Sequence, residues 1–126
     1  MSRNVVECIM VNKKGEALLQ KKTLDYIFHP GMWGIFGGVI EEGEDPKKAI
    51  IREIYEETGM IIKPRFYISR DYEHGSSKIF VAEIDGTSQI SLKEGAGFAF
   101  IDKKELNNIK INSFDLQTLL GFFKEK

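Results

Sequence analysis

One segment, residues 45–59, carries the signals of a helix at both ends. Asp45 is a favourable N-cap residue, and Pro46 suits the first helical position, where its missing N–H would have no partner. Gly59 suits the left-handed conformation that ends many helices. The sequence therefore predicts a helix over Pro46–Thr58. At about 100° per residue, its buried face is expected to consist of Ile50, Ile51, Ile54, Tyr55 and Thr58.

The same helix carries three acidic residues that are unfavourable for its stability. Glu53 is a like-charge neighbour of both Glu56 and Glu57 on the helix surface. Glu56 and Glu57 also lie in the last turn, where the helix dipole disfavours anions. Arg52 can pair with Glu56, but this offsets only part of the repulsion. Two interpretations are open: an acidic, solvated face, or a site where carboxylate oxygens converge on a divalent cation.

The rest of the chain is predicted to form short strands and two further helical segments. Strands are expected over residues 5–11, 16–22, 33–40, 61–72, 78–84 and 97–101, with a loop over residues 23–32. Asp102 begins a capping-box pattern that starts a short helical turn, and Ser113 is expected to cap a final amphipathic helix. The residues of that helix expected to face the core are Phe114, Leu119, Leu120 and Phe123. This order predicts an α/β domain with helices packed on largely antiparallel strands.

Length and charge narrow the class of function. The 126 residues fit a single domain over residues 1–126. A formal net charge of −1 provides no basic field for a nucleic-acid polymer, although a small anionic ligand is compatible with it. No apolar run suits a membrane span and residues 1–4 show no signal-peptide pattern, so a cytoplasmic protein without a membrane partner is expected. Cys8 lies in an apolar run and is expected to be a buried thiol. The oligomeric state stays open between monomer and homodimer.

Residues around the predicted helix complete a spaced pattern, Gly38-x5-Glu44-x7-Arg52-Glu53-Ile54-x-Glu56-Glu57-x-Gly59-Met60. This pattern resembles the full signature of the Nudix hydrolase family, and no position departs from it. The order of strands and helices is also similar, so the resemblance implies an α/β/α sandwich with a mixed, largely antiparallel sheet. One difference lies upstream, where Phe36 precedes the two glycines at a position that the family often gives to proline.

The resemblance also implies roles for the residues that match the signature. The implied ligands of Mg²⁺ or Mn²⁺ are Gly38, Glu53, Glu56 and Glu57. Arg52 would orient the glutamates by ion pairing, and Glu44 would support the metal ligands or act as an auxiliary acid–base group. The general base would be Glu53 or Glu57, or a loop residue outside the signature. Glu94 is the loop candidate, and its alternative interpretation is a solvated turn residue.

The implied reaction is metal-dependent cleavage of a nucleoside diphosphate linked to another group. Metal ions activate water near neutral pH and neutralise charge on phosphoryl oxygens, which suits the residue types of the signature. A nucleoside triphosphate is the expected substrate. ADP-ribose or another dinucleotide or sugar nucleotide is the alternative within enzymes. A nucleotide-sensing module without catalysis is the alternative outside them.

Four residues outside the signature are candidates for binding this small-molecule substrate. Lys22 ends a predicted strand and could approach a phosphate, or be an ordinary exposed lysine. Arg70, Tyr72 and Lys78 flank a predicted hairpin, where a stacking ring between two cations would suit a nucleotide. The alternative for these three is ordinary surface. Trp33 and Phe28 could cover a base, although aromatic residues beside strands more often belong to the core.

Overall fold

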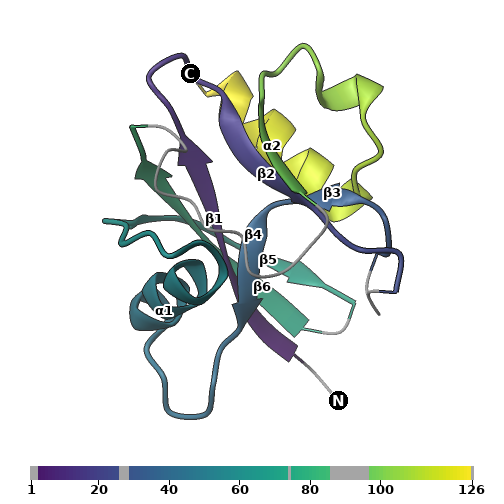
Figure 1. The fold of residues 1–126 in the computed structure, drawn as a ribbon. Helices are drawn as coiled ribbons and strands as arrows, with labels where there is room; N and C mark the ends of the chain where they lie inside the picture. Colours follow the sequence, from purple (N-terminus) through teal and green to yellow (C-terminus); the bar gives the residue numbers. More distant parts are fainter. Residues whose placement is uncertain (1–2, 26–28, 74, 86–96, 126) are drawn as a thin grey trace.

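A mixed sheet organises the computed structural model, which describes residues 3–25, 29–73, 75–85 and 97–125 (Figure 1). Its strands in the described ranges are β1 (Arg3–Val11), β2 (Ala17–Lys21), β3 (Trp33–Gly34), β4 (Phe36–Val39), β5 (Arg65–Tyr72), β6 (Gly75–Glu83) and β7 (Gly97–Ile101). The order is β3-β2-β1-β6-β5, with β4 also paired to β1 and β7 also paired to β2. The helical elements are α1 (Pro46–Thr58), the 3₁₀ turn η1 (Leu106–Asn108) and α2 (Ser113–Lys124).

Strand β1 lies at the centre and divides the core into two layers. It runs parallel to β6 and antiparallel to β2 and β4, so the sheet is mixed and largely antiparallel, as predicted. Because side chains alternate along a strand, Val6 and Cys8 face the core layer under α1, whereas Ile9 and Val11 face the layer under α2. The predicted arrangement of helices on both faces of a sheet is therefore confirmed.

Both predicted ends of α1 are confirmed. The side chain of Asp45 accepts hydrogen bonds from the backbone N–H groups of Lys47 and Lys48, at 3.0 and 3.2 Å. Gly59 adopts a φ of 79° and its N–H donates to the carbonyl of Tyr55 at 2.8 Å. That φ lies in the left-handed region, which glycine adopts without the steric cost of a Cβ.

The predicted buried face of α1 is partly wrong. Tyr55 is 56% exposed, whereas Ala49 and Glu57 are buried. The helix lies against β4, whose Gly37 and Gly38 present no side chains, so its contact face is turned toward the glutamates. Glu57 consequently lies within the buried arc, at 5% exposure, rather than at the edge of the core.

The C-terminal half of the chain differs from the prediction in β5, β6 and α2. Strand β5 begins at Arg65 rather than at residue 61. Strand β6 begins at Gly75 rather than at Lys78, so the connection to β5 is shorter than predicted. The N-cap of α2 is Asn112, whose Oδ1 accepts from the N–H of Asp115 at 2.9 Å, and Ser113 is the first helical residue. Along α2, Leu119 and Phe123 are buried as predicted, Phe114 is half-buried, Leu120 is 41% exposed and Phe122 is buried instead.

The expectation for Cys8 is met. Cys8 is fully buried, and burial raises the pKa of its thiol to about 12, so the thiol is inert at neutral pH. Within the described ranges, neither α1 nor α2 has the length and apolar character needed to cross a bilayer.

A buried polar contact joins α2 to the sheet. Asp115 Oδ2 accepts from the N–H of Ile35 at 3.0 Å and from Nδ2 of Asn112 at 2.9 Å. Glu7 on β1 approaches the same carboxyl and accepts from Oγ of Ser77 at 2.9 Å. Burial, reinforced by Asp115, raises the pKa of Glu7 well above its usual value of 4.5, and Lys22 opposes this only in part. The folded protein therefore favours protonated Glu7.

We expect the Glu7→Gln protein to gain stability relative to the unchanged protein as the pH rises above about 4.5. Above that value the unfolded chain ionises Glu7 while the folded protein retains the proton, so the free energy of unfolding falls with rising pH. Glutamine mimics the protonated acid and can donate to Asp115, so it removes this loss. Urea midpoints at pH 5 and pH 8 measure the effect. Glu83→Gln, at an exposed position of β6, is the matched control, and an equal shift in both variants would contradict the prediction.

Candidate active site

The site begins where α1 crosses the glycines of β4. A Cβ placed on Gly38 would lie 2.2 Å from Cδ of Glu53, well inside any real contact distance. Glycine at this position therefore lets the Glu53 carboxylate lie directly against the strand backbone. The structure thus brings together two residues of the signature that lie 15 positions apart, Gly38 and Glu53.

Arg52 is the centre of an ion-pair network beside this contact. Its guanidinium donates to both oxygens of Glu44, from Nε at 2.7 Å and from Nη2 at 2.9 Å. Its Nη1 donates to Oε1 of Glu53 at 3.0 Å and to Oε1 of Glu56 at 2.7 Å. The ion pairing predicted for Arg52 is therefore present, and one planar cation holds three carboxylates of the signature.

Glu44 is ionised in this arrangement. Hydrogen bonds from Arg52, and then from the backbone N–H of Glu41 at 3.0 Å, lower the pKa of Glu44 to about 2. The same contacts raise the pKa of Arg52 above its already high value. A carboxyl group with so low a pKa is already ionised near neutral pH, so it has no proton to donate. The geometry therefore favours Glu44 as a support for the other carboxylates over Glu44 as an acid.

The side chain of Glu57 is directed toward β2. Its Oε2 accepts a hydrogen bond from Nε2 of Gln20 at 3.3 Å, and both side chains are buried. Glu56, by contrast, has a side chain that is 52% exposed. The three glutamates of the helix therefore differ in environment: one is buried, one contacts β4 and one faces solvent.

Carboxylate oxygens are the type of ligand that a divalent cation prefers, but these carboxylates do not point toward one common position in this structure. Among the described residues, no group of three or more His, Cys, Asp or Glu side chains converges closely enough to hold a metal ion. Glu53 and Glu56 turn toward Arg52, and Glu57 turns toward Gln20. The donor set of carboxylate oxygens beside a strand with no side chain at Gly38 nevertheless fits a hard cation, which prefers oxygen ligands and needs close access.

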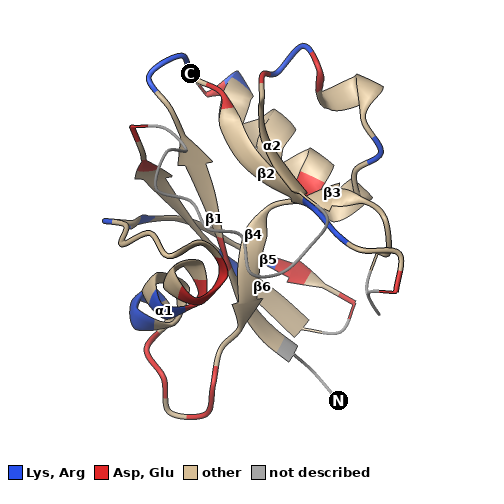
Figure 2. Ribbon diagram, in the orientation of Figure 1, with Lys and Arg blue, Asp and Glu red and all other residues tan. Residues whose placement is uncertain are grey.

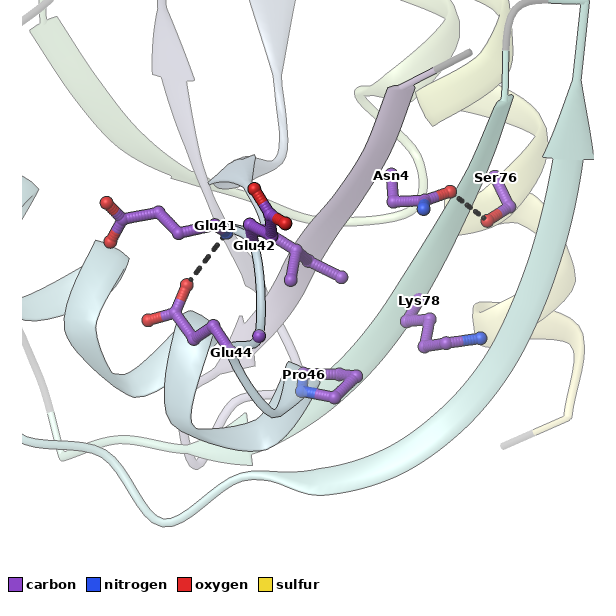
Figure 3. Close-up of a pocket in the computed structure, with 9 residues that line it drawn as sticks. Asn4, Glu41, Glu42, Glu44, Pro46, Ser76 and Lys78 are labelled. Carbon is purple, nitrogen blue, oxygen red and sulfur yellow. Dashed lines mark hydrogen bonds between the residues drawn. The ribbon is translucent and has the colours of Figure 1, made fainter.

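Lys78 lines a pocket that adjoins the loop before α1. The pocket has a volume of about 380 Å³ and is lined by Asn4, Ile40, Glu41, Glu42, Gly43, Glu44, Pro46, Ser76 and Lys78. Figure 3 shows Asn4, Ser76 and Lys78 on one wall and the acidic loop on the other. The acidic stretch continues from this loop into α1 (Figure 2). One wall of the pocket, at Glu44, therefore borders the Arg52 network.

Arg70 and Tyr72 lie on the opposite face of the sheet from Lys78. Arg70 donates from Nη1 to the carbonyl of Phe114 at 2.8 Å and to the hydroxyl of Thr118, and its guanidinium lies 4.1 Å from the centre of the Phe114 ring. The Tyr72 ring packs edge-on against the same Phe114 ring. The structure therefore separates the three residues that the hairpin interpretation grouped: Arg70 and Tyr72 contact α2, and Lys78 faces the side of α1.

Lys22 and Trp33 are the other predicted substrate contacts that the structure describes. Lys22 directly follows β2, and its Cε lies beside Gly34, 3.8 Å from where a Cβ would stand. Trp33 is half-buried and packs on the core layer under α2, as the structural interpretation expected. Glu94 and Phe28 lie outside the described residues.

Sequence reasoning missed Gln20 as a buried polar group and Glu7 as a partly buried one. Each interrupts a strand whose other residues are mostly apolar, Gln20 after Ala17–Leu19 and Glu7 after Val5 and Val6. A buried polar side chain needs a partner, so such an interruption is the signal that could have identified both.

Comparisons with known proteins identify the family of this chain. The family model described as NUDIX domain matches residues 1–119. Nucleoside triphosphatase NudI of Escherichia coli (strain K12) is 39% identical over 59 residues, which cover 47% of this chain and 42% of that protein. The protein of the same name from Klebsiella pneumoniae is 41% identical over 59 residues, covering 47% and 41%. These matches span less than half the length of the NudI proteins.

Solved structures show the same fold at low sequence identity. A MutT structure from a study of Aliivibrio salmonicida and Vibrio cholerae has a TM-score of 0.85 and 21% identity, covering 100% of both chains. A bifunctional NMN adenylyltransferase/ADP ribose pyrophosphatase from Francisella tularensis, complexed with AMP and a manganese ion, has a TM-score of 0.81 and 18% identity, covering 99% of this chain and 42% of the other. With the family model spanning residues 1–119 and the signature complete from Gly38 to Met60, the chain belongs to the Nudix hydrolase family.

Proposed function

We propose that the chain is a divalent-metal-dependent pyrophosphohydrolase whose substrate is a nucleoside triphosphate. The observation that carries the proposal is the Arg52 network, which holds three signature carboxylates beside the side-chain-free backbone of Gly38. The NudI relatives, which are named nucleoside triphosphatases, support this choice of substrate.

Nudix hydrolases generally use divalent metal ions, and the proposed ligands here are Gly38, Glu53, Glu56 and Glu57. When bound, Mg²⁺ or Mn²⁺ supplies an activated water and neutralises charge on the phosphoryl oxygens. Arg52 orients Glu53 and Glu56 through its Nη1, and Glu44 holds Arg52 in place through two hydrogen bonds. Glu53 or Glu57 accepts the proton of the attacking water.

The proposed substrate binds beside this network as a small molecule. Lys78 is the best placed of the four predicted substrate contacts, because it lines the pocket that Glu44 borders. Arg70 and Tyr72 would have to contact a part of the substrate that extends to the α2 face. Lys22 and Glu94 stay predictions, as do the cytoplasmic location, the single domain over residues 1–126 and the choice between monomer and homodimer.

ADP-ribose is the second candidate substrate, because the fold neighbour from Francisella tularensis is a bifunctional NMN adenylyltransferase/ADP ribose pyrophosphatase. A nucleotide-sensing module is the rival outside enzymes. Such a module would not need the ionic support that Arg52 gives to three carboxylates, so the network favours catalysis.

A nucleotide panel tests the proposal. The panel contains ribo- and deoxynucleoside triphosphates, ADP-ribose and a dinucleoside polyphosphate, each incubated with Mg²⁺, with Mn²⁺ or with EDTA. We expect nucleoside monophosphate and pyrophosphate from at least one triphosphate, and no product in EDTA. AMP and ribose 5-phosphate from ADP-ribose alone would replace the first substrate with the second. Nucleotide binding without hydrolysis under every metal condition would favour the sensing module.

A further inference from the structure

We propose that Gln20 is a positioning residue that fixes the orientation of the Glu57 carboxylate for metal binding. The inference rests on the proposed function, because it assumes that Glu57 is a ligand of the metal. It adds a residue from β2 to a site whose signature lies within β4, the following loop, α1 and the two residues after α1.

The geometry of the contact is that of two buried groups from distant parts of the chain. Gln20 is 8% exposed and Glu57 is 5% exposed, and Nε2 of Gln20 donates to Oε2 of Glu57 at 3.3 Å. The distance is at the long end for an N–H···O bond, so the contact contributes little to the stability of the fold. The other oxygen of the same carboxylate, Oε1, is also buried. A hydrogen bond that fixes Oε2 therefore also fixes where Oε1 points.

The backbone of Gln20 is held on both sides, which makes it a rigid support. Gln20 pairs with Gly34 of β3 on one side and with Phe98 of β7 on the other. Its side chain faces the layer under α1, the same face as Leu18 two residues earlier. A donor mounted on a strand that is paired at both edges has little freedom to follow the carboxylate if Glu57 moves.

The chemistry of the donor matters as much as its position. Arg52 is a cation, and it offsets the negative charge of each carboxylate that it holds. The amide of Gln20 carries no charge, so it can orient Glu57 without reducing the negative charge available to a dication. Residues that orient metal ligands by hydrogen bonds typically change metal affinity or activity by about 10- to 100-fold when they are replaced.

The test replaces Gln20 with methionine, which keeps the length of the side chain and removes the donor. We expect the Gln20→Met protein to bind Mn²⁺ about 10-fold more weakly in the absence of substrate, as measured by titration with detection of free Mn²⁺ by electron paramagnetic resonance. The Mg²⁺ concentration for half-maximal hydrolysis should rise by a similar factor, while the KM for nucleotide at saturating Mg²⁺ changes little. Leu18→Met is the matched control, because it alters a buried apolar residue two positions away on the same strand and face.

Two further variants separate positioning from packing. Gln20→Asn keeps an amide but shortens its reach by one methylene, so it should weaken Mn²⁺ binding as well, and it replaces Gln20→Met if that protein fails to fold. In a Glu57→Gln background, Gln20→Met should cause no further loss of Mn²⁺ affinity, because its effect acts through Glu57.

The outcomes distinguish this inference from the proposed function. Unchanged Mn²⁺ affinity in Gln20→Met and Gln20→Asn, with normal binding by the original protein, would overturn the positioning role alone. An equal loss in Leu18→Met would overturn it too, because packing would then explain the effect. If the original protein neither binds Mn²⁺ nor hydrolyses any nucleotide, the proposed function fails first and the positioning role fails with it.

Discussion

The Glu57→Gln protein is expected to remain folded and to lose about three orders of magnitude in kcat, within the range measured for loss of a positioned acid–base group. Glu57 is the most buried of the three helix glutamates, and its proposed role is that of metal ligand or general base. Glutamine keeps the shape and can still bond to Gln20, but it can neither accept the proton of a water nor offer a full charge to a dication. Steady-state hydrolysis of the best nucleotide of the panel measures the loss.

Glu83→Gln provides the control for this prediction. Glu83 is an exposed acid of β6 that does not line the pocket beside Glu44, so the substitution removes the same charge away from the site. Its kcat should stay close to that of the original protein. Activity of Glu57→Gln at the level of Glu83→Gln would exclude Glu57 from the reaction. Near-normal Mn²⁺ affinity with lost turnover would assign Glu57 as the base, whereas weakened affinity would assign it as a ligand.

The local features of the site could be predicted from sequence because neighbouring residues determine them. Asp45 and Gly59 specify the ends of α1 through bonds to backbone groups within four positions, and both caps form as expected. The pairing of Arg52 with Glu56 depends on one turn of the same helix. The apolar run over residues 5–11 likewise predicted a strand, and β1 covers it.

The features that could not be predicted depend on residues far apart in the chain. The bond from Gln20 to Glu57 spans 37 positions, and nothing near either residue specifies it. In the register of β5 and β6, Lys78 pairs with Ser69 and Arg70 pairs with Ser77. The side chains of Arg70 and Lys78 therefore lie on opposite faces of the sheet, and the shared location predicted for them failed. The orientation of α1 about its axis followed from its contact with the glycines of β4, which hydrophobic periodicity alone does not report.

Substituting Arg52 with lysine should reduce kcat by about 100-fold, the scale of loss that a displacement of about 1 Å causes in a catalytic site. Lysine keeps the positive charge but cannot donate to both oxygens of Glu44 while also reaching Glu53 and Glu56. The carboxylates should therefore lose their common orientation although the net charge is unchanged. Arg65→Lys, at an exposed position of β5, makes the same exchange away from the site and should leave kcat unaltered.

The acid stability of the Arg52→Lys protein gives a second measurement of the same network. The pKa of Glu44 is lowered from 4.5 to about 2 in the folded protein, so its contribution to stability is present above pH 4.5 and is lost as the pH falls toward 2. Because hydrogen bonds from Arg52 are the largest cause of that lowered pKa, lysine should restore much of it toward 4.5. The urea midpoint of the variant should then fall less steeply between pH 4.5 and pH 3 than that of the original protein. Equal acid slopes and an unchanged kcat would together show that charge alone, and not the planar geometry of the guanidinium, organises the carboxylates.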